Sequence, residues 1–322
     1  MSRTAKIWLI TAAFLILVGC IIFLGVMTAL KWDFMRLSTV EHQTVSYDIS
    51  EEYGNIAVVS KTADIAIVPS ENGNTSVVCY EDVKVSHSVS VKDGTLFIEV
   101  VDTRNWYEYI GVNFNTRRVT VYVPKGYNGA LSIDTSTGNV DISRELSFES
   151  VGIAASTADI ESYAPVYGAV KIAVDTGDIR VENVSVGSLE LSVSTGDITL
   201  CGVTCAGNVT VNVSSGDAIL SDVTCVSFSS VGGTGDIGLK NTVVRESISI
   251  KRTTGDVSFE RCDAATIFVE TDTGDVEGRL LSDKVFVVST STGDVEVPKT
   301  TSGGTCEIIT STGDVEFAIC AN

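Results

Sequence analysis

The chain has 322 residues, of which 44% are hydrophobic, 28 are glycine and only 4 are proline. This composition can build a large core, and scarce proline argues against a disordered, proline-rich stalk. The net charge is −19, and the first thirty residues hold two of the 22 bases and none of the 41 acids. The rest of the chain therefore repels nucleic acid and anionic lipid headgroups, so we expect no nucleic-acid partner.

Residues 7–30 form an uncharged, apolar run. As a helix this run spans about 36 Å, enough to cross a hydrocarbon core of roughly 30 Å. Basic residues flank both ends, but the short tail of residues 1–6 and the acidic bulk favour a cytoplasmic N-terminus. We predict a single-pass anchor in the cell membrane and an extracytoplasmic C-terminal domain.

Two alternatives to an uncleaved anchor stay open. A secretory signal usually has a shorter apolar region, of about 7–15 residues. The stretch Leu17-Val18-Gly19-Cys20 resembles a bacterial lipobox, which would make Cys20 a lipidated N-terminus. The apolar residues that follow Cys20 disfavour lipidation, because lipoproteins usually turn polar there.

A Thr-Gly-Asp motif returns every 19 or 20 residues in the second half of the chain. Its central position is occupied by Gly138, Ala158, Gly177, Gly196, Gly216, Gly235, Gly255, Gly274, Gly293 and Gly313. The residue two places after this position is always apolar, and those five and seven places before it are nearly always so. Apolar positions two residues apart predict strands with one buried face, not helices.

One repeat cannot bury its own apolar face, so neighbouring repeats must stack. We predict an all-β fold, in which residues 128–322 form a parallel β-solenoid of about ten coils with successive coils as neighbours. Glycine permits a left-handed backbone at tight corners, and Ala158 predicts a corner without positive φ in its coil.

Residues 45–127 are less regular, although Gly54-Asn55-Ile56 and Thr62-Ala63-Asp64-Ile65 echo the motif. Terminal repeats are commonly atypical because they cap the stack. We interpret residues 45–127 as an irregular β cap, preceded by a linker over residues 31–44. Almost no sequence follows Phe317 to cap the other end, so an open strand edge there would allow end-to-end self-association.

The apolar N-terminal run, the lead-in that ends in Val121-Tyr122-Val123-Pro124, and the repeated Thr-Gly-Asp-Val/Ile together resemble a bacterial family. This is the putative-adhesin β-strand-repeat family, whose function is unknown. The resemblance covers most of residues 45–320 and implies a cell-envelope β-solenoid. It supplies no catalytic residues.

The aspartates that follow the motif glycines are a candidate calcium column: Asp178, Asp197, Asp217, Asp236, Asp256, Asp275, Asp294 and Asp314. Carboxylates stacked about 4.8 Å apart repel one another, and Ca²⁺ would relieve this repulsion. The alternative is that each aspartate accepts backbone N–H bonds at its own corner. We favour the corner role, because Ca²⁺ takes about 6–8 oxygen ligands and one carboxylate per coil supplies too few. We expect no cofactor.

Four aromatic residues are candidates for ligand binding: Trp106, Tyr107, Tyr109 and Phe114. Aromatic faces suit sugar rings and protein partners, whereas packing within the cap is the alternative. Cys205 and Cys225 occupy one column on adjacent coils, within disulfide range if the coils stack. The alternative for this pair is two buried thiols.

An enzyme is the competing class of protein, because long β-helices include polysaccharide-active enzymes. The two histidines, His42 and His87, both precede the repeats, and no Ser-His-Asp or Cys-His constellation is apparent. Lys251-Arg252 and Glu260-Arg261 place charges in one repeat, but convergent groups are not evident. We therefore expect no catalytic residues.

The sequence thus predicts a membrane-anchored, extracytoplasmic β-solenoid that acts as a non-catalytic, adhesin-like binding or scaffold module. Its ligand, a glycan or a protein, is not identified by the sequence. An envelope-sensing accessory protein is the alternative within this class, and a polysaccharide-active β-helix enzyme is the alternative outside it.

Overall fold

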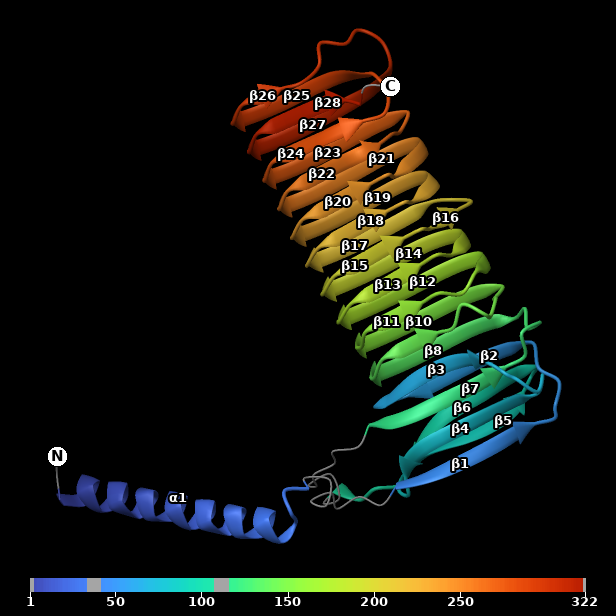
Figure 1. Cartoon of the computed structure of the whole chain (residues 1–322), viewed down its shortest axis with the longest axis vertical. Coiled ribbons are helices and arrows are strands. Elements are labelled where there is room, and N and C mark those ends of the chain that lie inside the picture. The colour runs from blue at the N-terminus through green and yellow to red at the C-terminus, as the bar shows by residue number, and fades with distance from the viewer. Residues whose placement is uncertain (1–2, 34–41, 107–115, 321–322) are drawn as a thin grey trace.

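The computed structural model describes residues 3–33, 42–106 and 116–320 (Figure 1). Among these residues, one helix, α1 (Arg3–Ala29), precedes 28 strands that belong to one sheet. The helix is long and apolar enough to cross a membrane, and almost all its side chains are exposed. The strands from residue 130 onward wind into the predicted parallel β-solenoid.

Each coil of the rod contributes one strand before the motif position and a shorter one after it (Figure 1). The strands before the motif position are β8 (Ala130–Thr137), β10 (Ser150–Thr157), β12 (Val166–Thr176), β14 (Ser185–Thr195), β17 (Val209–Ser215), β19 (Thr224–Thr234), β21 (Val243–Thr254), β23 (Thr266–Thr273), β25 (Lys284–Thr292) and β27 (Gly304–Thr312). Those after it are β9 (Val140–Ile142), β11 (Ile160–Ser162), β13 (Ile179–Glu182), β15 (Ile198–Cys201), β18 (Ala218–Ser221), β20 (Ile237–Lys240), β22 (Val257–Cys262), β24 (Val276–Leu280), β26 (Val295–Glu296) and β28 (Val315–Ile319). A two-residue strand, β16 (Thr204–Cys205), lies between β15 and β17.

The apolar columns of the sequence become ladders in the core. Ile153 of β10 lies opposite Ile133 in one neighbouring coil and Ile172 in the other. Side chains of the column after the motif are shut off from solvent, with Ile179 1% and Val257 0% exposed. The in-register stacking that the repeat predicted is therefore confirmed.

The corners explain why the motif needs glycine. The motif glycines have φ between 124° and 154°, whereas Ala158 is not among the residues with positive φ, as expected. Space is the second requirement, because a Cβ at Gly216 would lie 2.1 Å from the carbonyl oxygen of Gly196 in the neighbouring coil. Both the backbone angle and the close approach exclude larger residues at most corners.

The N-terminal region combines one further coil with an antiparallel cap. Strands β2 (Asn55–Ser60) and β3 (Ala63–Pro69) pair in parallel with β8 and β9 on one side. On their other side they pair with β6 (Thr95–Asp102) and β7 (Arg117–Val123). Strands β1 (His42–Ile49), β4 (Thr75–Asp82) and β5 (Val85–Lys92) then add antiparallel pairs, β1 and β7 with β4, and β5 with β6. The motif echoes at residues 54–65 thus belong to a genuine coil.

The far end of the rod differs from the expected order. Strand β27 pairs with β23 on one side and with β25 on the other, so the last coil in the sequence is inserted before the coil made by β25 and β26 (Figure 1). The expectation that successive coils are always neighbours is therefore wrong at this end. The open edge belongs to residues 284–297, not to the segment after Phe317.

Large and small side chains alternate between the coils in this inserted order. Gly278 lies opposite Phe259 in one neighbouring coil and Phe317 in the other. A Cβ at Gly278 would lie 2.7 Å from the Cβ of Phe259 and 2.9 Å from a ring carbon of Phe317. The Phe317 ring lies 5.8 Å from that of Phe259 and 5.4 Å from that of Phe286. Phe317 thus fills the space left by the glycine, and close packing favours the inserted order.

We expect Gly216→Ala to lower the free energy of unfolding by about 3 kcal/mol or more. Left-handed strain costs about 1–3 kcal/mol, and overpacking against the Gly196 carbonyl adds to it. The matched control is Gly152→Ala, where an added methyl meets no atom within 4 Å and φ is not positive. Urea unfolding midpoints measure the difference, and equal losses in the two variants would contradict this account of the corner.

Candidate functional site

The aspartate column forms a hydrogen-bonded ladder along the rod. The backbone N–H of each aspartate donates to Oδ1 of the aspartate in the preceding coil, at 2.8–3.0 Å, in the order Asp159, Asp178, Asp197, Asp217, Asp236, Asp256, Asp275, Asp314 and Asp294. The series begins one coil earlier, because Asn139 accepts from Asp159 at 3.0 Å and its own backbone N–H donates to Oδ1 of Asp64 at 3.0 Å. These bonds give the aspartates a role at the corner, and calcium binding stays an untested prediction.

The other predicted site residues are only partly described. Trp106 is 79% exposed at the end of a described segment, whereas Tyr107, Tyr109 and Phe114 lie outside the described residues. Cys205 and Cys225 lie on adjacent coils, since the residues before them, Thr204 and Thr224, are paired. Both cysteines are buried free thiols here, and burial raises the pKa of Cys225 to about 12. The disulfide therefore also stays a prediction.

The charged residues of the repeat at 251–261 do not converge. Lys251 is exposed and pairs with Glu270 at 2.6 Å, while Glu260 pairs with Lys240 at 2.8 Å. Arg252 instead turns into the core, is 4% exposed, and donates through Nη1 to the carbonyl of Val213 at 3.2 Å. Burial lowers the pKa of Arg252. These contacts do not assemble a catalytic site.

Arg252 depends on the glycine in the coil below it. A Cβ at Gly232 would lie 1.7 Å from Nη1 of Arg252, so the guanidinium occupies the space that the missing side chain leaves. Its second amino group lies 3.4 Å from the hydroxyl of Ser230, which is itself 0% exposed. Arg252, which breaks the apolar pattern of the repeat, is therefore a buried side chain whose contacts join three coils.

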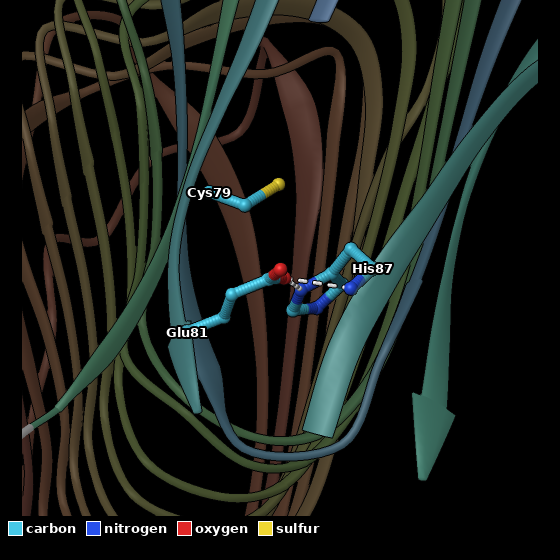
Figure 2. A group of neighbouring side chains, drawn as sticks. All are labelled: Cys79, Glu81 and His87. Carbon is cyan, nitrogen blue, oxygen red and sulfur yellow. Dashed lines mark hydrogen bonds and ion pairs between the residues drawn. The ribbon is translucent and has the colours of Figure 1, made fainter. Parts of the chain in front are cut away.

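The cap holds a polar cluster that sequence analysis did not find. Cys79 and Glu81 are two residues apart on β4 and point to the same buried face, and His87 faces them from β5. Figure 2 shows the three side chains directed toward one another from these two strands. Among the described residues, theirs is the one group of three metal-type side chains whose ligand atoms all lie within 4.8 Å of one another. Their exposures are 0% for Cys79, 0% for Glu81 and 2% for His87.

Hydrogen bonds fix the orientation of this cluster. One carboxylate oxygen of Glu81, Oε2, lies 3.0 Å from Nδ1 of His87 and accepts the His87 backbone N–H at 2.6 Å. The other oxygen, Oε1, accepts from the side-chain amide of Gln43 on β1 at 3.4 Å. Nε2 of His87 lies 3.5 Å from the hydroxyl of Ser60 on β2. Two further strands, β1 and β2, thus hold the Glu81–His87 pair.

Ser60, His87 and Glu81 have the connectivity of a hydroxyl, an imidazole and a carboxylate in a nucleophilic triad. The sequence analysis saw no such constellation, because β2, β4 and β5 meet only in the folded cap. Ser60 is 4% exposed, and its two partners are more buried still. A nucleophile must reach a substrate, and these groups are enclosed, so their arrangement does not serve acyl transfer in this conformation.

A second polar group lies close by in the cap. The carboxylate of Asp82 contacts Arg117 and lies 3.1 Å from Nδ1 of His42, whose ring stacks on Tyr80 at 5.2 Å. Arg117 also donates to the hydroxyl of Thr62. This group ties β1, β4 and β7 to the first coil. Both histidines of the chain therefore contact carboxylates inside the cap.

The fold defines the class of protein: a parallel β-solenoid closed at its N-terminal end by antiparallel strands. Residues 53–217 and 204–321 match the model of the Toastrack DUF4097 family, and the chain belongs to this family. The predicted resemblance to an adhesin-like repeat family of unknown function is thereby confirmed. No curated protein matches the chain.

Solved structures share the fold at low sequence identity. A putative adhesin from Parabacteroides distasonis is 13% identical with a TM-score of 0.53, over 87% of this chain and 98% of that one. A putative adhesin from Parabacteroides merdae is 13% identical with a TM-score of 0.55, over 75% and 97%. A putative lipid binding protein from Parabacteroides distasonis is 16% identical with a TM-score of 0.50, over 75% and 98%. At these identities the likeness concerns the fold alone.

Proposed function

We propose that the chain is a membrane-anchored, extracytoplasmic module that binds a ligand or acts as a scaffold without catalysis. The observation that carries the proposal is the distribution of polar chemistry. The triad-like group of Ser60, His87 and Glu81 is enclosed in the cap, and the corner aspartates of the rod accept backbone N–H groups of neighbouring coils. What remains for a partner is a long, acidic, repetitive surface. Two solved structures of similar fold are described as putative adhesins, which supports a binding role.

The anchor part of the proposal rests on α1. Apolar side chains cover the whole circumference of this helix, with Ile10, Phe14 and Ile22 each at least 61% exposed. A helix that is apolar all round requires an apolar environment, and a bilayer supplies one of matching thickness. Cys20 is also exposed on α1, so cleavage with lipidation at this residue is the alternative to test.

We expect the full chain, tagged at both ends and produced in a bacterial host, to stay in the membrane after carbonate washing. Protease added outside spheroplasts should remove the C-terminal tag and spare the N-terminal tag. The Cys20→Ala variant is the control and should behave identically. Loss of the N-terminal tag from the mature protein would contradict the uncleaved anchor, and dependence of membrane retention on Cys20 would indicate lipidation.

A binding role predicts that the exposed aromatic at the edge of the cap contributes to affinity. Full-length protein in nanodiscs would be screened against cell-wall glycans and surface proteins, with product release measured in parallel. For the ligand so identified, we expect Trp106→Ala to weaken binding at least about tenfold, as truncated aromatic anchors do. Tyr167→Ala is the matched control, since Tyr167 is 72% exposed on the rod against 79% for Trp106. An equal loss of affinity in the two variants would show that Trp106 does not belong to the binding site. Turnover of the ligand would overturn the non-catalytic role.

The open end of the rod supports a second partner, another copy of the chain. Strand β25 pairs with β27 on one side, and its inward residues Phe286 and Val288 are only partly buried. Exposed strand edges pair with other strands. The opposite end of the rod is closed by antiparallel strands, so a head-to-tail filament lacks a second parallel edge. We therefore propose a tail-to-tail dimer in which two β25 strands pair.

We expect Val287→Lys to abolish this association, because a lysine on an edge strand opposes pairing. Val231→Lys is the control, since both valines are 52% exposed and Val231 lies in the middle of the rod. Sedimentation of the full chain in detergent measures the dimer fraction. A monomeric wild-type protein, or equal loss in both variants, would contradict the tail-to-tail dimer.

A further inference from the structure

Three different metal-ligand types meet at one point of the cap. Cys79 offers a sulfur, Glu81 a carboxylate oxygen and His87 an imidazole nitrogen, and these atoms all lie within 4.8 Å of one another (Figure 2). Tetrahedral zinc sites have bonds of about 2.0–2.3 Å, which place neighbouring ligand atoms about 3.3–3.8 Å apart. Small side-chain movements would therefore bring the three atoms around one ion. A closed metal site accounts for the meeting of these three ligand types in the buried part of the cap.

Charge favours a divalent ion at this position. A thiolate from Cys79, a carboxylate from Glu81 and a neutral imidazole from His87 carry two negative charges between them. A divalent cation makes the group neutral, and neutrality matters because unpaired charge is costly where exposure is 0–2%. Sulfur and imidazole ligands select zinc or a similar borderline metal over Ca²⁺ or Mg²⁺.

The surroundings hold the ligands in a suitable form. A histidine that binds metal through one ring nitrogen usually donates through the other to an oxygen. Nε2 of His87 lies 3.5 Å from the hydroxyl of Ser60, which leaves Nδ1 directed at the cluster. Gln43 holds the outer oxygen of Glu81 at 3.4 Å. Both supporting contacts come from strands other than β4 and β5.

Cys79 differs from two of the buried thiols of the rod. Cys205 and Cys262 donate hydrogen bonds to carbonyls, for example from Cys262 to Leu239 at 3.2 Å. The Cys79 thiol makes no hydrogen bond within the described residues, and burial beside Glu81 raises its pKa to about 12.

We propose that Cys79, Glu81 and His87 bind a zinc-type divalent ion that ties strands β4 and β5 of the cap together. The enclosed position means that the ion enters as the cap folds, and it then stabilises the folded cap. His87 coordinates through Nδ1 in place of its contact with Glu81, and the fourth position is filled by a ligand from outside the group. This site is independent of the proposed binding and anchoring roles.

The test uses full-length protein produced in medium supplied with zinc or with cobalt, then purified in detergent. We expect about one metal ion per chain by mass spectrometry, and thiolate-to-cobalt charge-transfer absorption in the cobalt form. Cys79→Ser should remove the charge-transfer band, and His87→Gln should lower metal content at least about tenfold. Cys225→Ser is the matched control, because Cys225 is also a buried thiol, 4% exposed, and should leave both signals unchanged.

A second measurement, on the wild-type protein, tests the site even if a variant does not fold. Wild-type protein stripped with a chelator should melt at a lower temperature, and added zinc should restore the melting point, because an ion that binds only the folded state stabilises it. Ser60→Ala should keep the fold and weaken zinc affinity about tenfold by removing the support of His87. Metal content well below stoichiometry with an unchanged melting point in zinc would overturn the site. So would a charge-transfer band that survives in Cys79→Ser.

Discussion

The structure depends on one close backbone contact that is repeated at every corner formed by a motif glycine. The carbonyl oxygen of one corner residue approaches the next motif glycine so closely that an added Cβ would lie about 2.0–2.2 Å from it. This approach brings the following aspartate N–H within 2.8–3.0 Å of the carboxylate in the preceding coil. Because these contacts hold neighbouring coils in register, equivalent apolar side chains stack on one another and form continuous columns in the core.

That contact also explains why so much of the rod could be predicted from the sequence. Period-two apolar positions and the recurring glycine describe one coil, and every coil meets nearly the same environment above and below. Ile133, Ile153 and Ile172 occupy one column in the sequence and one ladder in the structure. The order of the terminal coils was beyond such reasoning, because coils with the same pattern are interchangeable. In the inserted order Phe317 packs against Gly278 and near Phe259, and such packing between coils is not contained in the pattern of one repeat.

The cap was predictable only in outline. Ser60, Glu81 and His87 carry no motif, and they meet because β2 is inserted between β6 and β8 while β4 and β5 fold back as antiparallel strands. No local pattern encodes those pairings. The aspartates, by contrast, follow the repeat: each accepts a backbone N–H, as the corner alternative expected, but from the neighbouring coil and not from its own corner. Sequence reasoning succeeded where the environment repeats and missed what depends on non-repeating contacts.

The same distinction explains where the molecule keeps its polar chemistry. Inward positions of the rod are mostly apolar, and a buried charged side chain among them is an exception. Arg252 is such an exception, since it needs Gly232 for space and the distant Val213 carbonyl as acceptor. In the cap, strands of different direction and sequence meet, and unlike side chains can face one another. The carboxylate of Glu81, the imidazole of His87 and the thiol of Cys79 therefore lie together in the cap, where the repeat ends.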